Sequence, residues 1–148
     1  MNTTDFLVSI RLVIKFHESM LKDICEEYHL SLIEANIISF LYNNPGKDTA
    51  GDIVELRMLS KGNVSRAVEE LIQKSLLSRR PDTADRRKIH LSLQPKARPI
   101  TDTLEGMKKE YSKVLFHGLS EEEIQEFHYL SERIKENAQN AMKRRENK

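Results

Sequence analysis

One stretch of the chain, residues 60–93, constrains the fold more than any other. Residues 60–74 repeat apolar side chains at intervals of three and four, which predicts a helix with a single apolar face. Two short runs follow, at 76–80 and 87–93, and in the second of them apolar and polar residues alternate as in a half-buried strand. The run 81–85 between them is rich in turn formers, so the two strands are expected to form a hairpin.

A second, shorter helix is expected directly before this segment. Thr49 can cap a helix that carries Ile53 and Val54, the chain then turns over residues 57–59, and Ser60 can cap the following helix. Two short helices joined by a tight turn, the second of them amphipathic, form a helix-turn-helix motif. The hairpin that follows then corresponds to a wing.

Longer helical patterns precede and follow this motif. Residues 6–24 form an apolar stripe at helical spacing, and Ser31 with Glu34 forms a capping box that opens another helix. Behind the wing, the next helix should begin between Pro95 and Pro99, because proline suits the first turn of a helix but not its interior.

The last part of the chain contains one further helix. Gly118 is expected to end the helix before it, and Ser120 with Glu123 forms a second capping box that opens it. The charged residues 143–148 are expected to fray into disorder.

Together these patterns predict a mainly α fold, a winged helix-turn-helix of about six helices plus a β-hairpin wing. Residues 1–148 are expected to form a single domain, with the DNA-binding lobe at about residues 30–95. The N- and C-terminal helices, at about residues 4–28 and 96–145, carry apolar stripes too extensive for a winged-helix core of about 70 residues to cover. We therefore expect them to form a dimerisation lobe, and a two-fold dimer would read a pseudo-palindromic site.

The net charge of +1 conceals an uneven distribution. Residues 61–98 hold ten basic and four acidic side chains, whereas residues 1–60 hold five basic and nine acidic ones. A basic middle segment favours a polyanionic partner, although a solvated charged surface would look the same on charge alone.

Several classes of protein are disfavoured by composition. No run approaches the roughly 18 apolar residues of a membrane span, and the N-terminus lacks the pattern of a signal peptide, so a cytoplasmic protein with no membrane partner is expected. The single cysteine and the dispersed histidines argue against a metal site. No nucleophile–base constellation and no glycine-rich phosphate loop is found, so neither a cofactor nor an enzymatic activity with catalytic residues is expected.

The helix at residues 60–74 carries candidate DNA contacts in its first two turns. Arg66 and Asn63 are candidates for base contacts, because arginine pairs bidentately with guanine and asparagine with adenine. Lys61 and Ser65 are candidates for phosphate contacts near the positive end of the helix dipole. In isolation, the same pattern would also fit a plain amphipathic helix with a solvated face.

The wing carries the second group of candidates. Arg86 is the first candidate for insertion into a minor groove, and Thr83, Arg87 and Lys88 are further candidate contacts. Asp85 is expected to stabilise the wing by pairing with one of the arginines, an arrangement compatible with DNA binding.

The run Asp85 to Leu93 resembles the wing signature of the MarR-type (multiple antibiotic resistance regulator) transcription factors. The run Leu59 to Leu77 is similar to that family's recognition helix and first wing strand, in the same order and at the same distance from the wing. One departure is Ser75, which stands where a glycine is usual at the helix end. The resemblance implies a homodimeric regulator of double-stranded DNA, expected to act as a repressor.

The same resemblance implies a small amphipathic or phenolic effector that binds between the two lobes. His17, Tyr28, Phe40 and Tyr42 are the candidate lining residues, with ordinary core packing as the alternative for each. Some members of the family sense peroxide through a thiol, so a redox-sensing regulator that uses Cys25 is one alternative. A winged-helix module that binds an acidic protein partner is the other.

Overall fold

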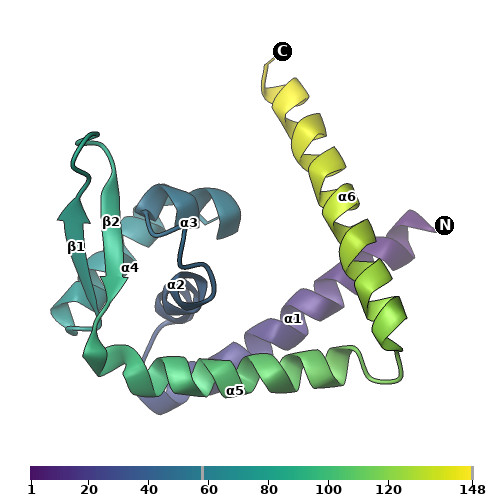
Figure 1. Ribbon diagram of the computed structural model, residues 1–148, viewed down its shortest axis with the longest axis horizontal. Coiled ribbons are helices and arrows are strands. Elements are labelled where there is room, and N and C mark those ends of the chain that lie inside the picture. Colours follow the sequence, from purple (N-terminus) through teal and green to yellow (C-terminus); the bar gives the residue numbers. More distant parts are fainter. Residues whose placement is uncertain (58, 148) are drawn as a thin grey trace. The chain divides into compact units, whose positions relative to one another are not determined.

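The computed structural model of the protein describes residues 1–57 and 59–147, and it confirms a mainly helical winged fold (Figure 1). The chain divides into two compact units, Met1–Tyr111 and Ser112–Lys148. The elements follow one another in the order α1 (Thr3–Tyr28), α2 (Leu32–Asn43), α3 (Ala50–Arg57), α4 (Lys61–Gln73), β1 (Leu77–Pro81), β2 (Ile89–Leu93), a 3-10 turn η1 (Pro95–Ala97), α5 (Arg98–Leu115) and α6 (Glu121–Glu146).

Side-chain caps set the starts of the helices where the sequence places them. At α2, the Ser31 hydroxyl accepts from the Glu34 N–H at 3.2 Å and the Glu34 carboxylate accepts from the Ser31 N–H at 2.8 Å, which confirms the predicted capping box. Thr49 and Asp52 make the same reciprocal pair at α3, and Ser60 caps α4. The turn expected over 57–59 includes residue 58, which lies outside the described residues.

The helix-turn-helix is held by the apolar face of α4. Val64, Ala67, Val68 and Leu71 are all buried, and α4 packs on both α2 and α3. Around them lie fully buried side chains from α1, α2 and α3, of which Leu21, Ile37, Ile38 and Ile53 are the largest. Each such side chain stabilises the fold by about 1.5–3 kcal/mol relative to an exposed one.

A left-handed turn joins α4 to the wing. Ser75 has φ of 63°, the Ser75 N–H donates to the Ile72 carbonyl, and the Leu76 N–H donates to the Leu71 carbonyl. This is a Schellman motif, and the side chains of Leu71 and Leu76, which flank it, are both buried. Leu76 therefore belongs to the helix end, and β1 begins one residue later than the sequence predicts.

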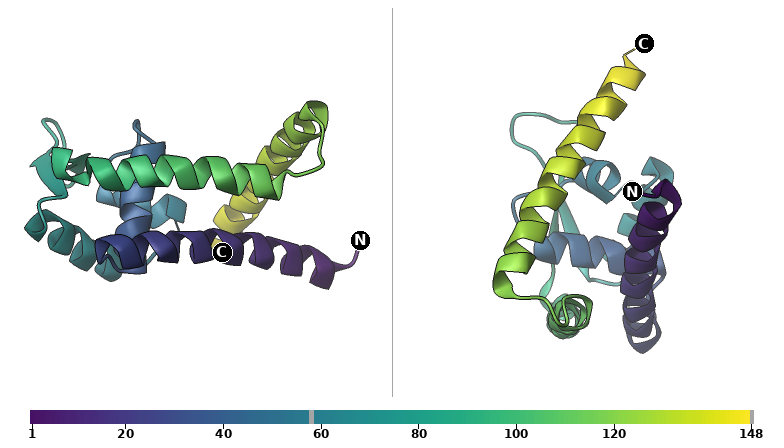
Figure 2. Two further views of the ribbon diagram at one scale, coloured as in Figure 1. Left: turned by 90° about the horizontal axis from the view of Figure 1, so that it is seen from below. Right: turned by 90° about the vertical axis from the view of Figure 1, so that its right-hand side faces the viewer.

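The two strands pair antiparallel, from Leu77 opposite Leu93 to Pro81 opposite Ile89. The sequence predicts the second strand from residue 87, but β2 begins at Ile89. Arg87 and Lys88 belong to the loop instead, because their N–H groups donate to Asp85 within it. In that loop the Asp85 carboxylate accepts from the Arg87 N–H, and the Lys88 N–H donates to the Asp85 carbonyl. Figure 2 shows the hairpin and α4 at the end of the first unit where α5 begins.

The final helices agree with the predicted boundaries except at their C-terminal ends. α5 begins at Arg98, inside the predicted interval, but it ends at Leu115, and Gly118 with φ of 82° closes the turn that follows. The Ser120–Glu123 capping box opens α6 as predicted. The expected disorder over 143–148 is wrong for the described part, because α6 continues to Glu146; the basic side chains of its last turn interact favourably with the negative end of the helix dipole. Within the described residues, no helix is long and apolar enough to cross a membrane.

Candidate nucleic-acid interface

The first two turns of α4 present polar groups to solvent. The side chains at Lys61, Asn63, Ser65 and Arg66 are all exposed, whereas Val64 between them is buried in the core. No acidic residue lies in the first turn of α4, and its N-terminal N–H groups carry the positive end of the helix dipole. This end of the helix can therefore approach a phosphate backbone without repulsion from its own first turn.

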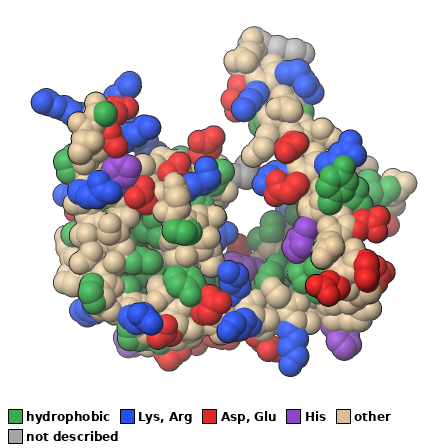
Figure 3. All heavy atoms as spheres, in the orientation of Figure 1, with side chains coloured by type: hydrophobic (Ala, Val, Ile, Leu, Met, Phe, Trp, Pro, Cys, Tyr) green, Lys and Arg blue, Asp and Glu red, His purple; other side chains and the backbone are tan. Residues whose placement is uncertain are grey.

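The tip of the wing presents a second basic surface. Thr83, Arg86, Arg87 and Lys88 are all exposed, and Figure 3 shows Lys and Arg side chains projecting around the tip of the hairpin. Asp85 accepts from the Arg87 N–H at 3.0 Å and from its Nε at 3.3 Å, so it fixes the backbone while the Arg87 side chain stays 92% exposed. Arg86 has no such partner among the described residues and points its charge to solvent.

One of the basic side chains beside the wing is already paired. Arg79 on β1 forms an ion pair with Glu69 on α4, and both side chains are about half exposed. An exposed pair adds little stability by itself, but it joins the first wing strand, β1, to α4. Spacing along the sequence gives no signal for it, since the two residues lie in different elements.

The loop of the wing is built around Asp82. One of its carboxylate oxygens accepts from the N–H groups of Ala84 and Asp85 at 2.9 and 2.8 Å, and the other lies 2.7 Å from Nε2 of His90. The hydrogen bonds from His90 and from the two N–H groups hold the pKa of Asp82 well below its usual range.

His90 also reaches back to the helix-turn-helix. Its Nδ1 lies 2.7 Å from the carboxylate of Asp48, which precedes α3, so the ring stands between two carboxylates. Hydrogen bonds to Asp82 and Asp48 raise the pKa of His90. From sequence, His90 is merely a polar position on the second strand, and the 42 residues between it and Asp48 hide the pairing.

The four candidate effector residues lie at different places in the first unit. Phe40 is buried in the core, whereas the hydroxyl of Tyr42 donates to Glu105 on α5 at 2.9 Å. The hydroxyl of Tyr28 lies 2.8 Å from that of Thr103, also on α5. These three side chains therefore have different surroundings: Phe40 packs in the core, and the hydroxyls of Tyr28 and Tyr42 each contact α5.

His17, the fourth candidate, lies further along α1, with its ring edge-on to that of Tyr111 at 5.2 Å between centroids. Burial and the nearby Arg57 guanidinium lower the pKa of His17. The Nε of Arg57 is buried and, within the described residues, has no hydrogen-bond partner. Sequence reasoning missed Arg57, and a basic residue at the end of a short helix gives no signal of burial.

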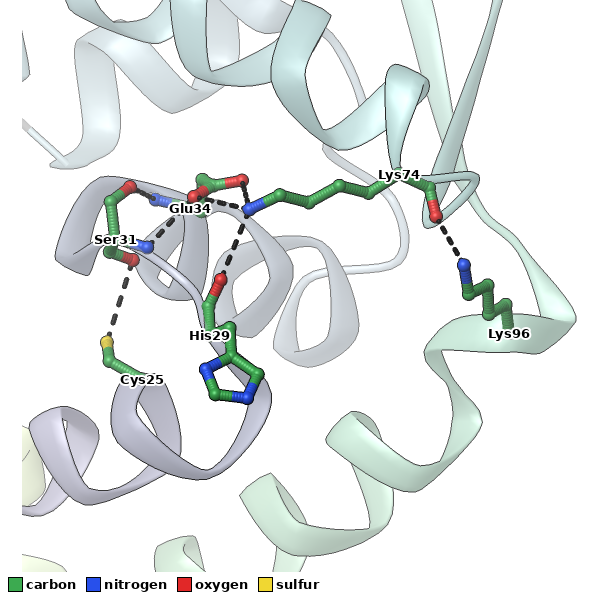
Figure 4. A network of polar contacts seen from close by, with 6 residues as sticks. All are labelled: Cys25, His29, Ser31, Glu34, Lys74 and Lys96. Atoms are coloured by element: carbon green, nitrogen blue, oxygen red, sulfur yellow. Dashed lines mark hydrogen bonds and ion pairs between the residues drawn. The ribbon is translucent and has the colours of Figure 1, made fainter.

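Cys25 lies at the edge of a polar network that joins α1, α2 and α4 (Figure 4). Its Sγ donates weakly to the Ser31 carbonyl at 3.6 Å, and Glu34 in the same network pairs with Lys74 at 2.8 Å. Burial raises the pKa of the Cys25 thiol, and the carboxylates of Glu34 and Glu26 add to that effect. The site therefore disfavours the thiolate that a fast-reacting redox sensor requires.

A helix-turn-helix whose second helix is followed by a two-stranded wing defines the winged helix-turn-helix class of proteins. A family model described as the MarR family matches residues 29–88, which contain α2, α3, α4 and the wing up to its loop. Over these residues the chain is similar to the MarR family, in agreement with the resemblance found in the sequence. A search of curated proteins found no match.

Solved structures extend the likeness to the rest of the fold. A MarR transcriptional regulator from Methanosarcina mazei Go1 is 18% identical with a TM-score of 0.76, and the match covers 94% of this chain and 99% of that one. A putative MarR family regulator from Listeria monocytogenes in complex with 26mer DNA is 16% identical with a TM-score of 0.75, covering 88% and 87%.

A third structure, of Bordetella bronchiseptica BpsR, is described as showing the regulation of DNA binding by 6-hydroxynicotinic acid. It is 20% identical with a TM-score of 0.66, and the match covers 88% of this chain and 98% of that one. The fold is therefore that of MarR-type winged helix proteins. These proteins are transcriptional regulators, in agreement with the prediction that the chain is not an enzyme.

Proposed function

We propose that this protein is a sequence-specific transcription regulator that binds double-stranded DNA as a homodimer and represses transcription. The observation that carries the proposal is the exposed, acid-free N-terminal face of α4, in the same unit as a wing with an exposed basic tip. The Listeria monocytogenes neighbour, which has the same fold, was solved with DNA.

In this proposal the N-terminal half of α4 enters the major groove. Arg66 and Asn63 contact base edges, and Lys61 and Ser65 hold phosphates. At the wing, Arg86 enters the adjacent minor groove, while Thr83, Arg87 and Lys88 contact the sugar-phosphate backbone of the DNA. Glu69 and Glu70 lie further along α4, so they stay away from the phosphates when the helix docks by its first turns.

Selection of bound duplexes from a randomised DNA pool, at two salt concentrations, tests this function. We expect an enriched inverted repeat whose half-sites lie about 10 base pairs apart, centre to centre. The logarithm of the affinity should fall with the logarithm of salt concentration by about 0.9 for each phosphate neutralised. If no motif is enriched and the binding disappears at the higher salt, the basic surface is a general polyanion site and the proposal fails.

The homodimer is supported by apolar surface that each unit leaves uncovered. On α1, Leu7, Ile10 and Ile14 are 43–56% exposed, and on α6 Phe127 and Ile134 are 49% and 53% exposed. Exposed stripes of this kind normally mark an interface with another chain. A regulator with two recognition helices needs such a partner in order to read both halves of an inverted repeat.

Sedimentation should therefore give twice the chain mass of 17.2 kDa at micromolar concentration. Ile134→Glu, which places a charge on the apolar stripe of α6, is expected to shift the protein toward the monomer. The control is Gln139→Glu, which adds the same charge at an exposed position about 140° around the helix from Ile134 and should leave the dimer intact. A wild-type protein that sediments as a monomer would contradict the proposed dimer.

We further propose a small amphipathic or phenolic effector that regulates DNA binding. The support is the buried Nε of Arg57, which lies near His17 and has no hydrogen-bond partner within the described residues, so that an acidic group on an aromatic ring would find a partner there. The role of His17, Tyr28, Phe40 and Tyr42 as lining residues remains part of this proposal. The duplex obtained by selection provides the assay, with 6-hydroxynicotinic acid, the compound named for BpsR, as the first ligand to add.

A further inference from the structure

The ring of His90 makes two short contacts that together require a proton on each nitrogen. Nδ1 and Nε2 each lie 2.7 Å from a carboxylate oxygen, of Asp48 and Asp82 respectively. A neutral imidazole has one N–H and one lone pair, so it can donate to only one of the two carboxylates. Its lone pair would face the other carboxylate at a distance where the two repel each other.

The two carboxylates belong to different parts of the interface. Asp48 precedes α3, and its carbonyl accepts from the Leu91 N–H at 2.8 Å, while Thr49 next to it caps α3 and bridges to His90. Asp48 is therefore fixed both to the helix-turn-helix and to the middle of β2 in the wing.

The Asp82 side controls the loop of the wing. Asp82 accepts from the N–H groups of Ala84 and Asp85, and its own N–H donates to the Lys88 carbonyl at 3.0 Å. Asp85 in turn orders Arg87. The position of the Asp82 carboxylate thus decides how firmly the residues of the tip, Arg86 included, are held.

We propose that His90 is a positioning residue for the wing: when protonated, its ring ties the Asp82 loop to Asp48, and loss of one proton releases one contact and loosens the basic tip. This role deepens the proposed DNA-binding function and rests on it for its consequence. The wing would then bind DNA more tightly at low pH, because an ordered tip loses less conformational entropy on binding.

The direction of the pH dependence follows from the charged groups that face the ring. Asp82 and Asp48 favour the protonated form, whereas Arg80 on β1, opposite His90 in the hairpin, disfavours it. Because the pKa of folded His90 is raised, the contacts are complete below about 6.5 and are lost as the pH rises through the raised value.

The first test is made on the protein without DNA. Order parameters of the Ala84 and Asp85 Cα atoms, from ¹³C relaxation, should fall from about 0.8 near pH 6 to below about 0.6 near pH 9. His90→Gln should give the low value at both pH values. His117→Gln, at an exposed histidine in the other unit, is the matched control and should behave as the wild type.

The Asp48→Asn substitution tests whether His90 positions the wing through its protonation or has only a general structural role. An asparagine amide can donate to the lone pair of neutral His90, so both contacts survive without the second proton. The Asp48→Asn protein should therefore keep the high order parameters near pH 9. An unchanged wild-type wing between the two pH values, or an Asp48→Asn wing that loosens as the wild type does, would overturn the proposal.

The second test uses the duplex selected by the wild-type protein. We expect His90→Gln to weaken binding near pH 6 by about fivefold, with the deficit shrinking as the pH rises. Asp48→Asn should remove most of the pH dependence. If the relaxation results hold but the wild type selects no duplex, the DNA-binding function fails and the positioning role stands; if the duplex is bound and the wing does not respond to pH, the positioning role fails.

Discussion

Replacing Arg66 and Arg86 together with alanine is expected to weaken binding to the selected duplex by about a hundredfold or more. Each arginine is proposed to read a groove, and a good base contact contributes about 1–3 kcal/mol of discrimination. Both side chains are exposed, and neither has an ion-pair partner to lose among the described residues, so the fold and the dimer should not change. The two effects should add, since α4 and the wing tip contact different grooves.

The two single substitutions should change DNA binding in different ways as well as by different amounts. Arg66→Ala is expected to relax the preference for one base of each half-site, because that base loses its bidentate donor. Arg86→Ala is expected to weaken the preference for a narrow, A·T-rich minor groove beside it. Fluorescence anisotropy with the selected duplex and with single-base changes separates the two effects.

A matched control removes the same charge elsewhere. Arg98→Ala with Lys109→Ala also deletes two exposed cations, but from α5, and should change affinity by less than about threefold. If this control loses as much affinity as the Arg66 and Arg86 pair, then only total charge matters. The proposed groove contacts would then be wrong.

The parts of the fold that the sequence predicts correctly are those determined by neighbouring residues. Capping boxes at Ser31 and Ser120, the cap at Ser60 and the alternation in β2 each depend on side chains within a few positions of one another. The left-handed position at Ser75 is also visible, as the place where the resembling family has glycine. Local chemistry therefore suffices for the order and type of the elements.

The contacts that organise the candidate interface join residues far apart in the chain. Asp48 and His90 are 42 residues apart, and Glu34 and Lys74 are 40 apart. Periodicity can assign such residues to a polar or an apolar face, but it cannot show which polar groups meet. The exposed residues of α4 can be predicted because exposure follows from the period of the helix, and those of the wing tip because they lie in a turn between two strands. The pairing of Arg79 with Glu69 cannot be predicted in this way.

The aromatic residues proposed for an effector show the same limit. Tyr28 and Tyr42 look alike in sequence, yet their hydroxyls bind Thr103 and Glu105 on α5. Phe40 lies in the core. Residue type alone cannot show that the hydroxyls of Tyr28 and Tyr42 contact α5 while Phe40 packs in the core.

Of the substitutions proposed, Glu34→Ala should lower the free energy of unfolding the most, by about 2–4 kcal/mol, because it breaks a buried ion pair and a capping box together. The Glu34 side chain is 3% exposed and accepts from Lys74 at 2.8 Å and from the Ser31 N–H at 2.8 Å. Lys74 is 41% exposed and can turn to water, which keeps the loss below that of a fully buried pair. Urea unfolding at a fixed protein concentration measures the change in the free energy of unfolding.

A matched substitution at an exposed pair isolates the effect of burial. Glu132→Ala removes the partner of Lys135, where both side chains are more than half exposed, and should cost less than about 0.5 kcal/mol. Equal losses for the two variants would show that burial of Glu34 contributes nothing to the strength of its pair.

The pH dependence of Glu34→Gln gives an independent measure of the same ion pair. Burial by itself would raise the pKa of Glu34, but hydrogen bonds from Lys74 and from Ser31 outweigh it, and the pKa is lowered from its ordinary value of 4.5. A lowered pKa contributes stability that is complete above the unfolded value and is lost as the pH falls through the folded one. The difference in unfolding free energy between wild type and Glu34→Gln should therefore be constant from about pH 7 to about pH 5 and shrink below about pH 4.5. A difference that stays constant down to about pH 3 would show that the charge on Glu34 does not stabilise the join between α2 and α4.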